Sequence, residues 1–249
     1  MHDVIRPLLS ASNRRALGNA AYADVLHNPV TTSFLPTTLT AASAKFVGLL
    51  GPEVSLAGGF NDRGFAVYPS GVTGGDGDVR FTLPSVQTPR TDGTFAAGLN
   101  LSSATVSLGE IESSERADAR FRNAFSILRF KLSSDVAKLT LTGTAPLAGT
   151  PPLKVNYSSD ASDGRLVIDA SKSWPSSDKV SLLPSGGASH FSDGTVYNLL
   201  VLPGSHSSLT LDITFASDKM GVYTKSVSKV PVFEPSKFYT LNFDSDADE

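Results

Sequence analysis

The sequence contains no cysteine. A disulfide framework is therefore excluded for this 249-residue chain, as is structural zinc held by thiolates. Long hydrophobic runs are missing too, and no stretch approaches the roughly 18 apolar residues that suggest a membrane-spanning helix. Neither sign of charge dominates: the net charge of -3 gives no reason to expect a nucleic-acid partner. Hydrophobic residues still make up 40% of the chain, which is enough for a core and argues against global disorder.

Motifs for catalysis or metal binding are also missing. No two histidines lie at metal-ligand spacing, and neither a G-x-S-x-G elbow nor a phosphate-binding Gly-Lys-Ser/Thr motif occurs. His206 lies among Gly and Ser residues, which indicates a turn. The run 74–78 has too few ligands for a calcium loop and is better explained as a solvated hairpin loop. A catalytic triad assembled across the fold stays an alternative, because triads are defined by geometry, but we predict no catalytic residue, metal or cofactor.

The clearest pattern that is present is an alternation in the middle of the chain. Leu128, Phe130 and Leu132 alternate with charged residues, and after a Ser-Ser-Asp break Leu139 and Leu141 alternate with polar ones. A period of two indicates strands with one face on a core and the other in water. Because Ser-Ser-Asp is typical of a turn, we predict a β-hairpin.

A helical stripe competes with this interpretation at the start of the same region. Its apolar positions follow helical spacing: Ala117, Phe121, Phe125, Leu128 and Leu132. We prefer a strand from Ser126 onward, because charged residues alternate with the apolar set there. A short helix over 115–122 stays open.

The rest of the chain is patterned as short strands separated by Gly, Pro, Ser and Asp. Strand 209–215 is the clearest, since Leu209, Leu211, Ile213 and Phe215 alternate with polar residues. Many closely spaced strands with such turns predict an all-β sandwich or barrel. The most polar segment, 113–118, marks the boundary between two halves. The remaining expected strands are 33–35, 44–50, 54–60, 64–68, 79–83, 94–101, 105–111, 153–157, 165–169, 179–183, 196–202, 223–232 and 237–243.

Three regions, spread over residues 60–243, occur in an order that one known family shares. The central one is the F-x-N-A-x-x-x-L-x-F-x-L run from Phe121, followed by a strand and Leu-Ala-Gly. The regions on either side contain the segments 65–69, 83–87, 92–95, 197–204 and 238–241. Together they resemble the fimbrillin-like (Mfa-like) proteins, the type V pilins of Bacteroides-group bacteria.

The resemblance implies a fold and a location. The expected fold is all-β, with two tandem transthyretin-like β-sandwich domains. The expected division is 1–30 for a leader and first strand, 31–117 for the N-terminal domain and 118–249 for the C-terminal domain. Family members reach the cell surface as outer-membrane lipoprotein precursors through a signal and a lipidated Cys. Neither occurs in this sequence, so either the sequence is a trimmed form of the precursor, which we prefer, or the inference of export is wrong.

The resemblance also implies a function, that of a structural or accessory subunit of cell-surface fimbriae which supports adhesion. Its partners would be other pilin subunits, which join by strand addition after an arginine-specific protease removes the leader. The Arg14-Arg15 pair followed by Ala16 suits such a cleavage, although a flexible tail with two adjacent arginines is the simpler explanation. Strand donation would use Tyr239, Leu241 and Phe243. Only six residues follow Phe243, so a terminal, anchoring or accessory role is an alternative to a shaft subunit.

An alternative function is suggested by Trp174. It is the only Trp, and exposed aromatic platforms hold sugars in carbohydrate-binding sandwiches. A surface carbohydrate-binding module is therefore the second hypothesis, with a host protein or glycan as partner. A lone Trp in a loop is more commonly a plug over the edge of a core, and we prefer that interpretation.

Overall fold

The computed structural model describes five N-terminal strands (6–10, 29–31, 35–39, 44–47 and 63–68) and the ranges 79–107, 120–156, 165–216 and 221–241. Strands dominate, and the helical elements η3 (Ala97–Leu99) and η4 (Ser185–Gly187) are single 3-10 turns. The all-β prediction is therefore confirmed. In the described part of the chain, no helix has the length and apolar character needed to span a membrane. The transthyretin-like topology stays a prediction.

The chain forms two compact units that are not consecutive in the sequence. The first consists of Met1–Phe81, Leu101–Ala124 and Pro152–Lys172, and the second of Thr82–Asn100, Phe125–Pro151 and Ser173–Glu249. The boundary expected between residues 117 and 118 lies outside the described residues. The predicted division 1–30, 31–117 and 118–249 therefore stays a prediction.

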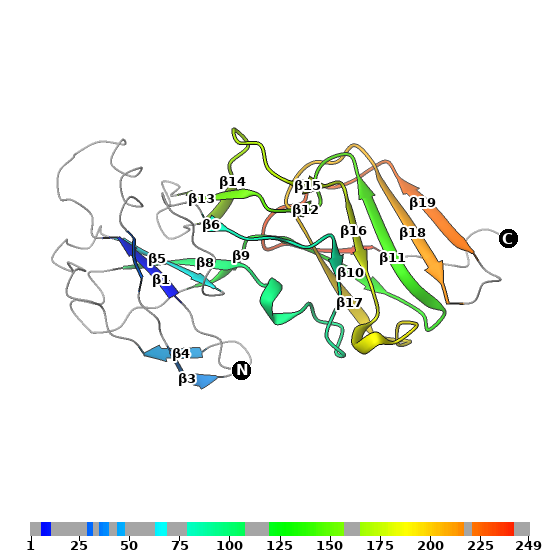
Figure 1. The fold of residues 1–249 in the computed structure, drawn as a ribbon, viewed down its shortest axis with the longest axis horizontal. Coiled ribbons are helices and arrows are strands. Elements are labelled where there is room, and N and C mark those ends of the chain that lie inside the picture. Colours follow the sequence, from blue (N-terminus) through cyan, green and yellow to red (C-terminus); the bar gives the residue numbers. More distant parts are fainter. Residues whose placement is uncertain are drawn as a thin grey trace. The chain divides into compact units, whose positions relative to one another are not determined.

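The first unit contains a five-stranded sheet, a three-stranded sheet and a hairpin (Figure 1). The five-stranded sheet has the order β2 (Pro29–Thr31), β1 (Arg6–Ser10), β5 (Arg63–Tyr68), β8 (Ser102–Ser107) and β9 (Arg122–Asn123). The three-stranded sheet has the order β14 (Arg165–Ile168), β13 (Pro152–Asn156) and β6 (Val79–Arg80), and β3 (Leu35–Leu39) pairs with β4 (Ala44–Val47).

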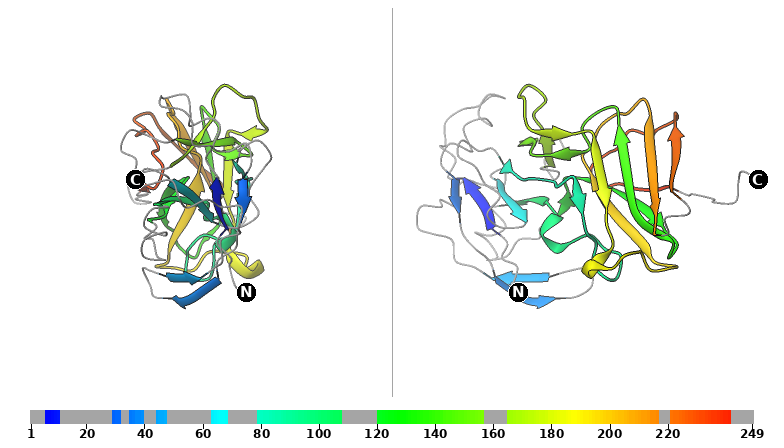
Figure 2. Two further views of the ribbon diagram at one scale, coloured as in Figure 1. Left: turned by 90° about the vertical axis from the view of Figure 1, so that its left-hand side faces the viewer. Right: turned by 45° about the vertical axis from the view of Figure 1, so that its right-hand side comes forward.

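The second unit is sandwich-like, with a five-stranded and a three-stranded sheet on a shared core. The larger sheet has the order β19 (Val222–Val227), β18 (Leu209–Phe215), β11 (Val136–Gly143), β16 (Lys179–Leu182) and β7 (Val86–Gln87); Figure 2 shows its long strands side by side. The smaller sheet has the order β17 (Val196–Val201), β10 (Ser126–Lys131) and β20 (Phe238–Leu241), and β12 (Ala148–Gly149) pairs with β15 (Ser176–Ser177).

The core of the second unit is built from the alternating residues that the sequence indicated. On β10, Leu128 and Phe130 are buried while Arg129 and Lys131 are exposed. On the larger sheet, the buried residues of β11 and β18 face one another in register, for example Leu139 opposite Ile213. Each fully buried side chain of this size contributes about 1.5–3 kcal/mol, so this core is the main source of the unit's stability.

The predicted hairpin between β10 and β11 is wrong. β10 pairs with β17 and β20, whereas β11 pairs with β16 and β18, so the Ser-Ser-Asp segment crosses from one sheet to the other. Local alternation could not distinguish these cases, because a strand has the same period whichever partner it takes.

Several other expected elements differ from the structure. Residues 94–101 form an irregular segment and η3 rather than a strand, and β19 ends at Val227 rather than continuing to 232. The open alternative of a helix over 115–122 falls largely outside the described residues, and Arg122 begins strand β9. The expected strand 54–60 and the loop 74–78 also lie outside them.

Candidate functional site: the sheet edges of the second unit

The three-stranded sheet of the second unit has two edge strands, β17 and β20. An edge strand presents unpaired backbone N–H and C=O groups to which another chain can add. In an all-β protein expected to assemble by strand addition, such edges are the first place to look for function.

The β17 edge is covered by the side chain of Gln87. This side chain is only 2% exposed. Its Nε2 donates a hydrogen bond to the carbonyl of Leu200 (2.8 Å), and its Oε1 accepts one from the Leu200 N–H (3.0 Å). A further bond from Nε2 to the Pro84 carbonyl is longer, at 3.3 Å. One primary amide therefore satisfies both backbone groups of Leu200, as a neighbouring strand would.

Two other segments cover the neighbouring positions of the same edge. The Asn198 N–H donates to the Gly93 carbonyl (2.9 Å), and the Leu202 N–H donates to the Leu147 carbonyl (2.9 Å). Gly93 has a φ of 81° in the turn that begins at Arg90, and a Cβ placed there would lie 2.2 Å from the Val196 carbonyl oxygen. Only glycine allows the turn to approach β17 this closely.

Gln87 reaches β17 because its own backbone belongs to the larger sheet. β7 pairs in parallel with β16: the Ser181 N–H donates to the Ser85 carbonyl (2.7 Å), and the Leu183 N–H to the Gln87 carbonyl (3.0 Å). Val86 then points outward and is 53% exposed, while Gln87 points inward. Gln87 thus ties the two sheets together on this side of the unit.

The β20 edge is different. β20 pairs with β10 in parallel, from Ile127 opposite Phe238 to Phe130 opposite Leu241. No strand pairs with its outer side within the part of the chain that the structure describes. Phe238 is 53% exposed there, and the Arg129 guanidinium lies over its ring at 4.0 Å from the centroid.

Tyr239 anchors β20 to the segment that precedes it. Its hydroxyl donates to the Val232 carbonyl (2.7 Å) and accepts from the Glu234 N–H (2.9 Å). Its ring lies 5.1 Å from that of Phe233, which is fully buried. β20 is therefore held on one side by its ladder with β10 and otherwise by side chains.

β19, the edge of the larger sheet, is also uncovered among the described residues. Val222 and Tyr223 on it are 59% and 41% exposed. Tyr223 lies opposite Ile213 of β18, so both point to the core face of the sheet. On the other face, the Asp212 carboxylate accepts a bond from the Thr224 hydroxyl (2.7 Å).

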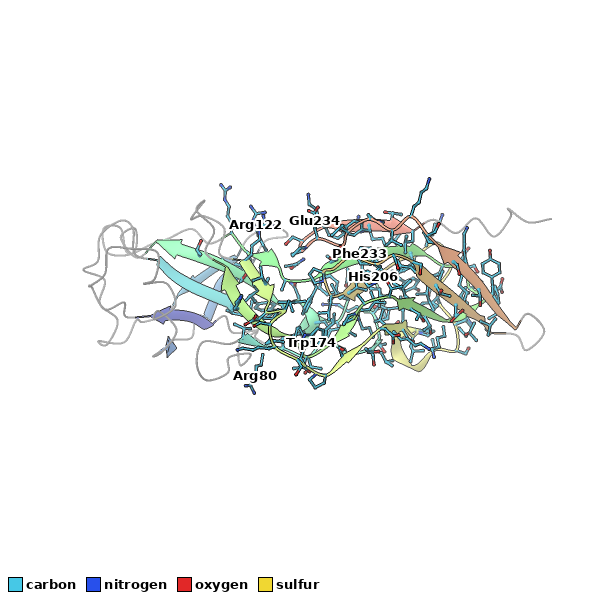
Figure 3. The ribbon with its side chains drawn as sticks, turned by 90° about the horizontal axis from the view of Figure 1, so that it is seen from above. Arg80, Arg122, Trp174, His206, Phe233 and Glu234 are labelled. Atoms are coloured by element: carbon cyan, nitrogen blue, oxygen red, sulfur yellow. The ribbon has the colours of Figure 1, made fainter. Side chains whose placement is uncertain are left out.

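His206 is buried at only 6% exposure, which the interpretation as a turn residue did not predict. Its ring lies 5.4 Å from that of Phe233 (Figure 3), and a Cβ on Gly143 would lie 2.5 Å from its Nδ1. Neither ring nitrogen has a hydrogen-bond partner among the described residues. Burial without a compensating bond lowers the pKa of His206, because the imidazolium cannot be solvated there.

The predicted site residues are only partly described. Tyr239 and Leu241 lie on β20 and contact the core, whereas Phe243, Arg15 and Ala16 lie outside the described residues. Trp174 is half-buried, and a Cβ on Gly149 would lie 2.8 Å from its ring, so it covers that glycine. Its role as a ligand platform stays a prediction. The described ranges contain no cluster of His, Asp and Glu that could hold a metal ion.

Sequence reasoning missed Gln87, which has the most hydrogen-bonded side chain at the β17 edge. It is the single glutamine of the chain, and it lies in a segment quoted above only for its family resemblance. Hydropathy favours Val86 as the buried residue of that pair. The one available signal was that the only glutamine of the chain lies in the short segment 83–87.

Comparisons with known proteins agree with this architecture. No family model and no curated protein sequence matches the chain. A solved structure of a candidate cell adhesion protein from Bacteroides ovatus matches 99% of this chain and 84% of its own, at 16% identity and a TM-score of 0.50. A fimbrial protein from Bacteroides vulgatus matches 99% and 89%, at 12% identity and a TM-score of 0.39. The first match shows a shared fold.

Proposed function

We propose that this protein is a structural or accessory subunit of cell-surface fimbriae of the type V class, which joins other pilin subunits by strand addition and supports adhesion. The observation that carries the proposal is the place of β1 between β2 and β5 in the first unit. β1 precedes Arg15, so cleavage between Arg15 and Ala16 would remove it. The sheet would then have a gap beside β5, with unpaired backbone groups that a strand of another subunit could fill.

The donated strand in this proposal is the C-terminal one, with Tyr239, Leu241 and Phe243 as its anchors. β20 is an edge strand of only four residues, so its release costs one ladder and a few side-chain contacts. Tyr239 and Leu241 pack against the core from the same strand face, and this alternation would serve equally well in the gap of a neighbouring subunit. If β20 stays in place instead, the protein is a terminal, anchoring or accessory subunit.

The proposed location is the cell surface, reached through an outer-membrane lipoprotein precursor. The structural neighbour from Bacteroides ovatus, a candidate cell adhesion protein, supports a surface role. The lipid anchor, and a host protein or glycan as a further partner, come from the family resemblance alone. We infer a role in assembly rather than in catalysis.

Protease-triggered polymerisation tests the proposal. Treatment with an arginine-specific protease, followed by gel electrophoresis without boiling, should produce a ladder of SDS-resistant polymers. The matched control replaces Arg14 and Arg15 with lysine, which keeps the charge but removes the cleavage site. Absence of a ladder from the parent chain, or an equal ladder from the lysine variant, would contradict the proposal.

Truncation at the C-terminus distinguishes a subunit that donates its last strand from a terminal, anchoring or accessory subunit. Deleting residues 237–249 should abolish the ladder and leave a folded monomer if β20 donates. A truncated chain that unfolds would show that β20 is an intramolecular strand, because Tyr239 and Leu241 would then be needed by their own core.

A further inference from the structure

We propose that Gln87 guards the β17 edge against strand addition by a second copy of this chain. The proposal rests on the proposed assembly by strand addition, and it assigns a specificity-determining residue to that process. A protein that exchanges strands between identical subunits has to leave one acceptor open and close the others.

Three alternate N–H groups along and just after β17 are paired with partners outside its sheet. The N–H groups of Asn198, Leu200 and Leu202 all donate to partners outside the sheet. Two of these partners are backbone carbonyls, of Gly93 and Leu147. Leu200 has the only side-chain partner of the three, and its carbonyl is satisfied by the same amide.

This geometry makes Gln87 the removable part of the closure. An added strand would have to bond to both the N–H and the C=O of Leu200, and the Gln87 amide occupies both. The Gln87 side chain is almost fully buried and spans from the larger sheet to the smaller one. A side chain of the same size without an amide would fill the space but leave both backbone groups of Leu200 unpaired.

β20 and β19, two further edge strands of the second unit, have no such amide on their outer sides among the described residues. β20 begins with the exposed Phe238, and β19 begins with the exposed Val222 and Tyr223. Of these three edges, only β17 therefore has its outward backbone groups bonded by a side-chain amide. A donated strand that meets this unit is excluded from the β17 side and has to bind elsewhere.

A simpler interpretation is that Gln87 only satisfies buried polar groups. Ser181 on the neighbouring strand provides the matched control, because its hydroxyl is also buried and hydrogen-bonded, to the Thr140 hydroxyl at 2.9 Å. Ser181→Ala removes a buried hydrogen bond but leaves the outward backbone groups of Leu200 paired. The two interpretations therefore predict different results for Gln87→Leu and Ser181→Ala.

The experiment measures self-association of the full chain without protease. We expect the mass of Gln87→Leu, by light scattering across a concentration series, to rise from monomer to multimer, while the parent and Ser181→Ala stay monomeric. Hydrogen exchange at the Leu200 amide should be faster than in the parent when the variant is dilute, and slow again when it is associated.

Three outcomes would overturn the proposal. They are a folded Gln87→Leu variant that stays monomeric, equal association by Ser181→Ala, and association that leaves the Leu200 amide exposed. If Gln87→Leu does not fold, Gln87→Asn withdraws the amide by one methylene and is measured in the same way. Since no protease is used, failure here leaves the ladder experiment unaffected, and failure of the ladder leaves this result interpretable.

Discussion

The outer sides of the two edge strands of the three-stranded sheet, β17 and β20, differ in how their backbone groups are paired. At β17, the Gln87 amide satisfies the N–H and C=O of Leu200, and the Gly93 carbonyl satisfies the N–H of Asn198. At β20, no described strand or amide does so, and Tyr239 holds the strand from its core side. The outward backbone groups of Leu200 on β17 are hydrogen-bonded, whereas β20 is anchored by the hydrogen bonds and ring contact of Tyr239. A closed edge resists addition, whereas an anchored strand can be released without leaving its own edge groups in a buried site.

The largest expected effect comes from breaking the strand on which both edges depend. Ile213→Asp places a carboxylate in the core shared by the two sheets, and we expect a loss of about 4 kcal/mol or more in the free energy of unfolding. Asp212→Asn, one residue away, should change it by less than about 0.5 kcal/mol, because an amide oxygen can still accept the Thr224 bond. Chemical denaturation measures both; equal losses would refute the strand assignment.

Phe233→Ala should affect the β20 edge more than the β17 edge. Phe233 is fully buried between His206 and Tyr239, so its removal should cost about 3–5 kcal/mol and loosen β20 selectively. Hydrogen exchange should accelerate at 238–241 more than at Leu200. Uniform acceleration along both edges would mean that they are not independently held.

Tyr239→Phe tests the anchor more gently. The ring contact with Phe233 is kept, but the bonds to Val232 and Glu234 are lost, which should cost about 1 kcal/mol. If β20 is the donor, this variant should also form protease-triggered ladders faster than the parent chain. Slower ladders from a variant with faster exchange at β20 would count against donation.

A smaller, pH-dependent effect is expected from His206. Because burial lowers the pKa of His206 in the folded state, the unfolded chain binds the proton more readily. Stability should therefore fall as the pH drops below the ordinary histidine value of 6.5, and stop falling below the lowered folded value. Melting temperatures between about pH 7.5 and about pH 5 measure this loss. His206→Leu should remove most of it, and the exposed His190→Gln variant serves as the control.

Local patterns predicted the strands well and their partners poorly. Leu128 and Phe130 were expected to face a core, and they do, because side-chain direction alternates along any strand. The hairpin was wrong, because a turn-like Ser-Ser-Asp segment also suits a crossing between sheets. His206 was predicted to be a turn residue because its sequence neighbours are Gly and Ser. Its burial depends on Phe233, which lies later in the chain and packs against it, so the local sequence could not indicate it.

By itself, the sequence determined an all-β chain, its main strands, and the inward residues of β10, β11 and β18. These depend on the backbone period and on the burial of apolar side chains, which are local properties. Only the tertiary structure decided which strands became edges and that a glutamine rather than a valine faces inward at β7. Gln87 and Leu200 are 113 positions apart, and no local pattern records a hydrogen bond formed across that distance.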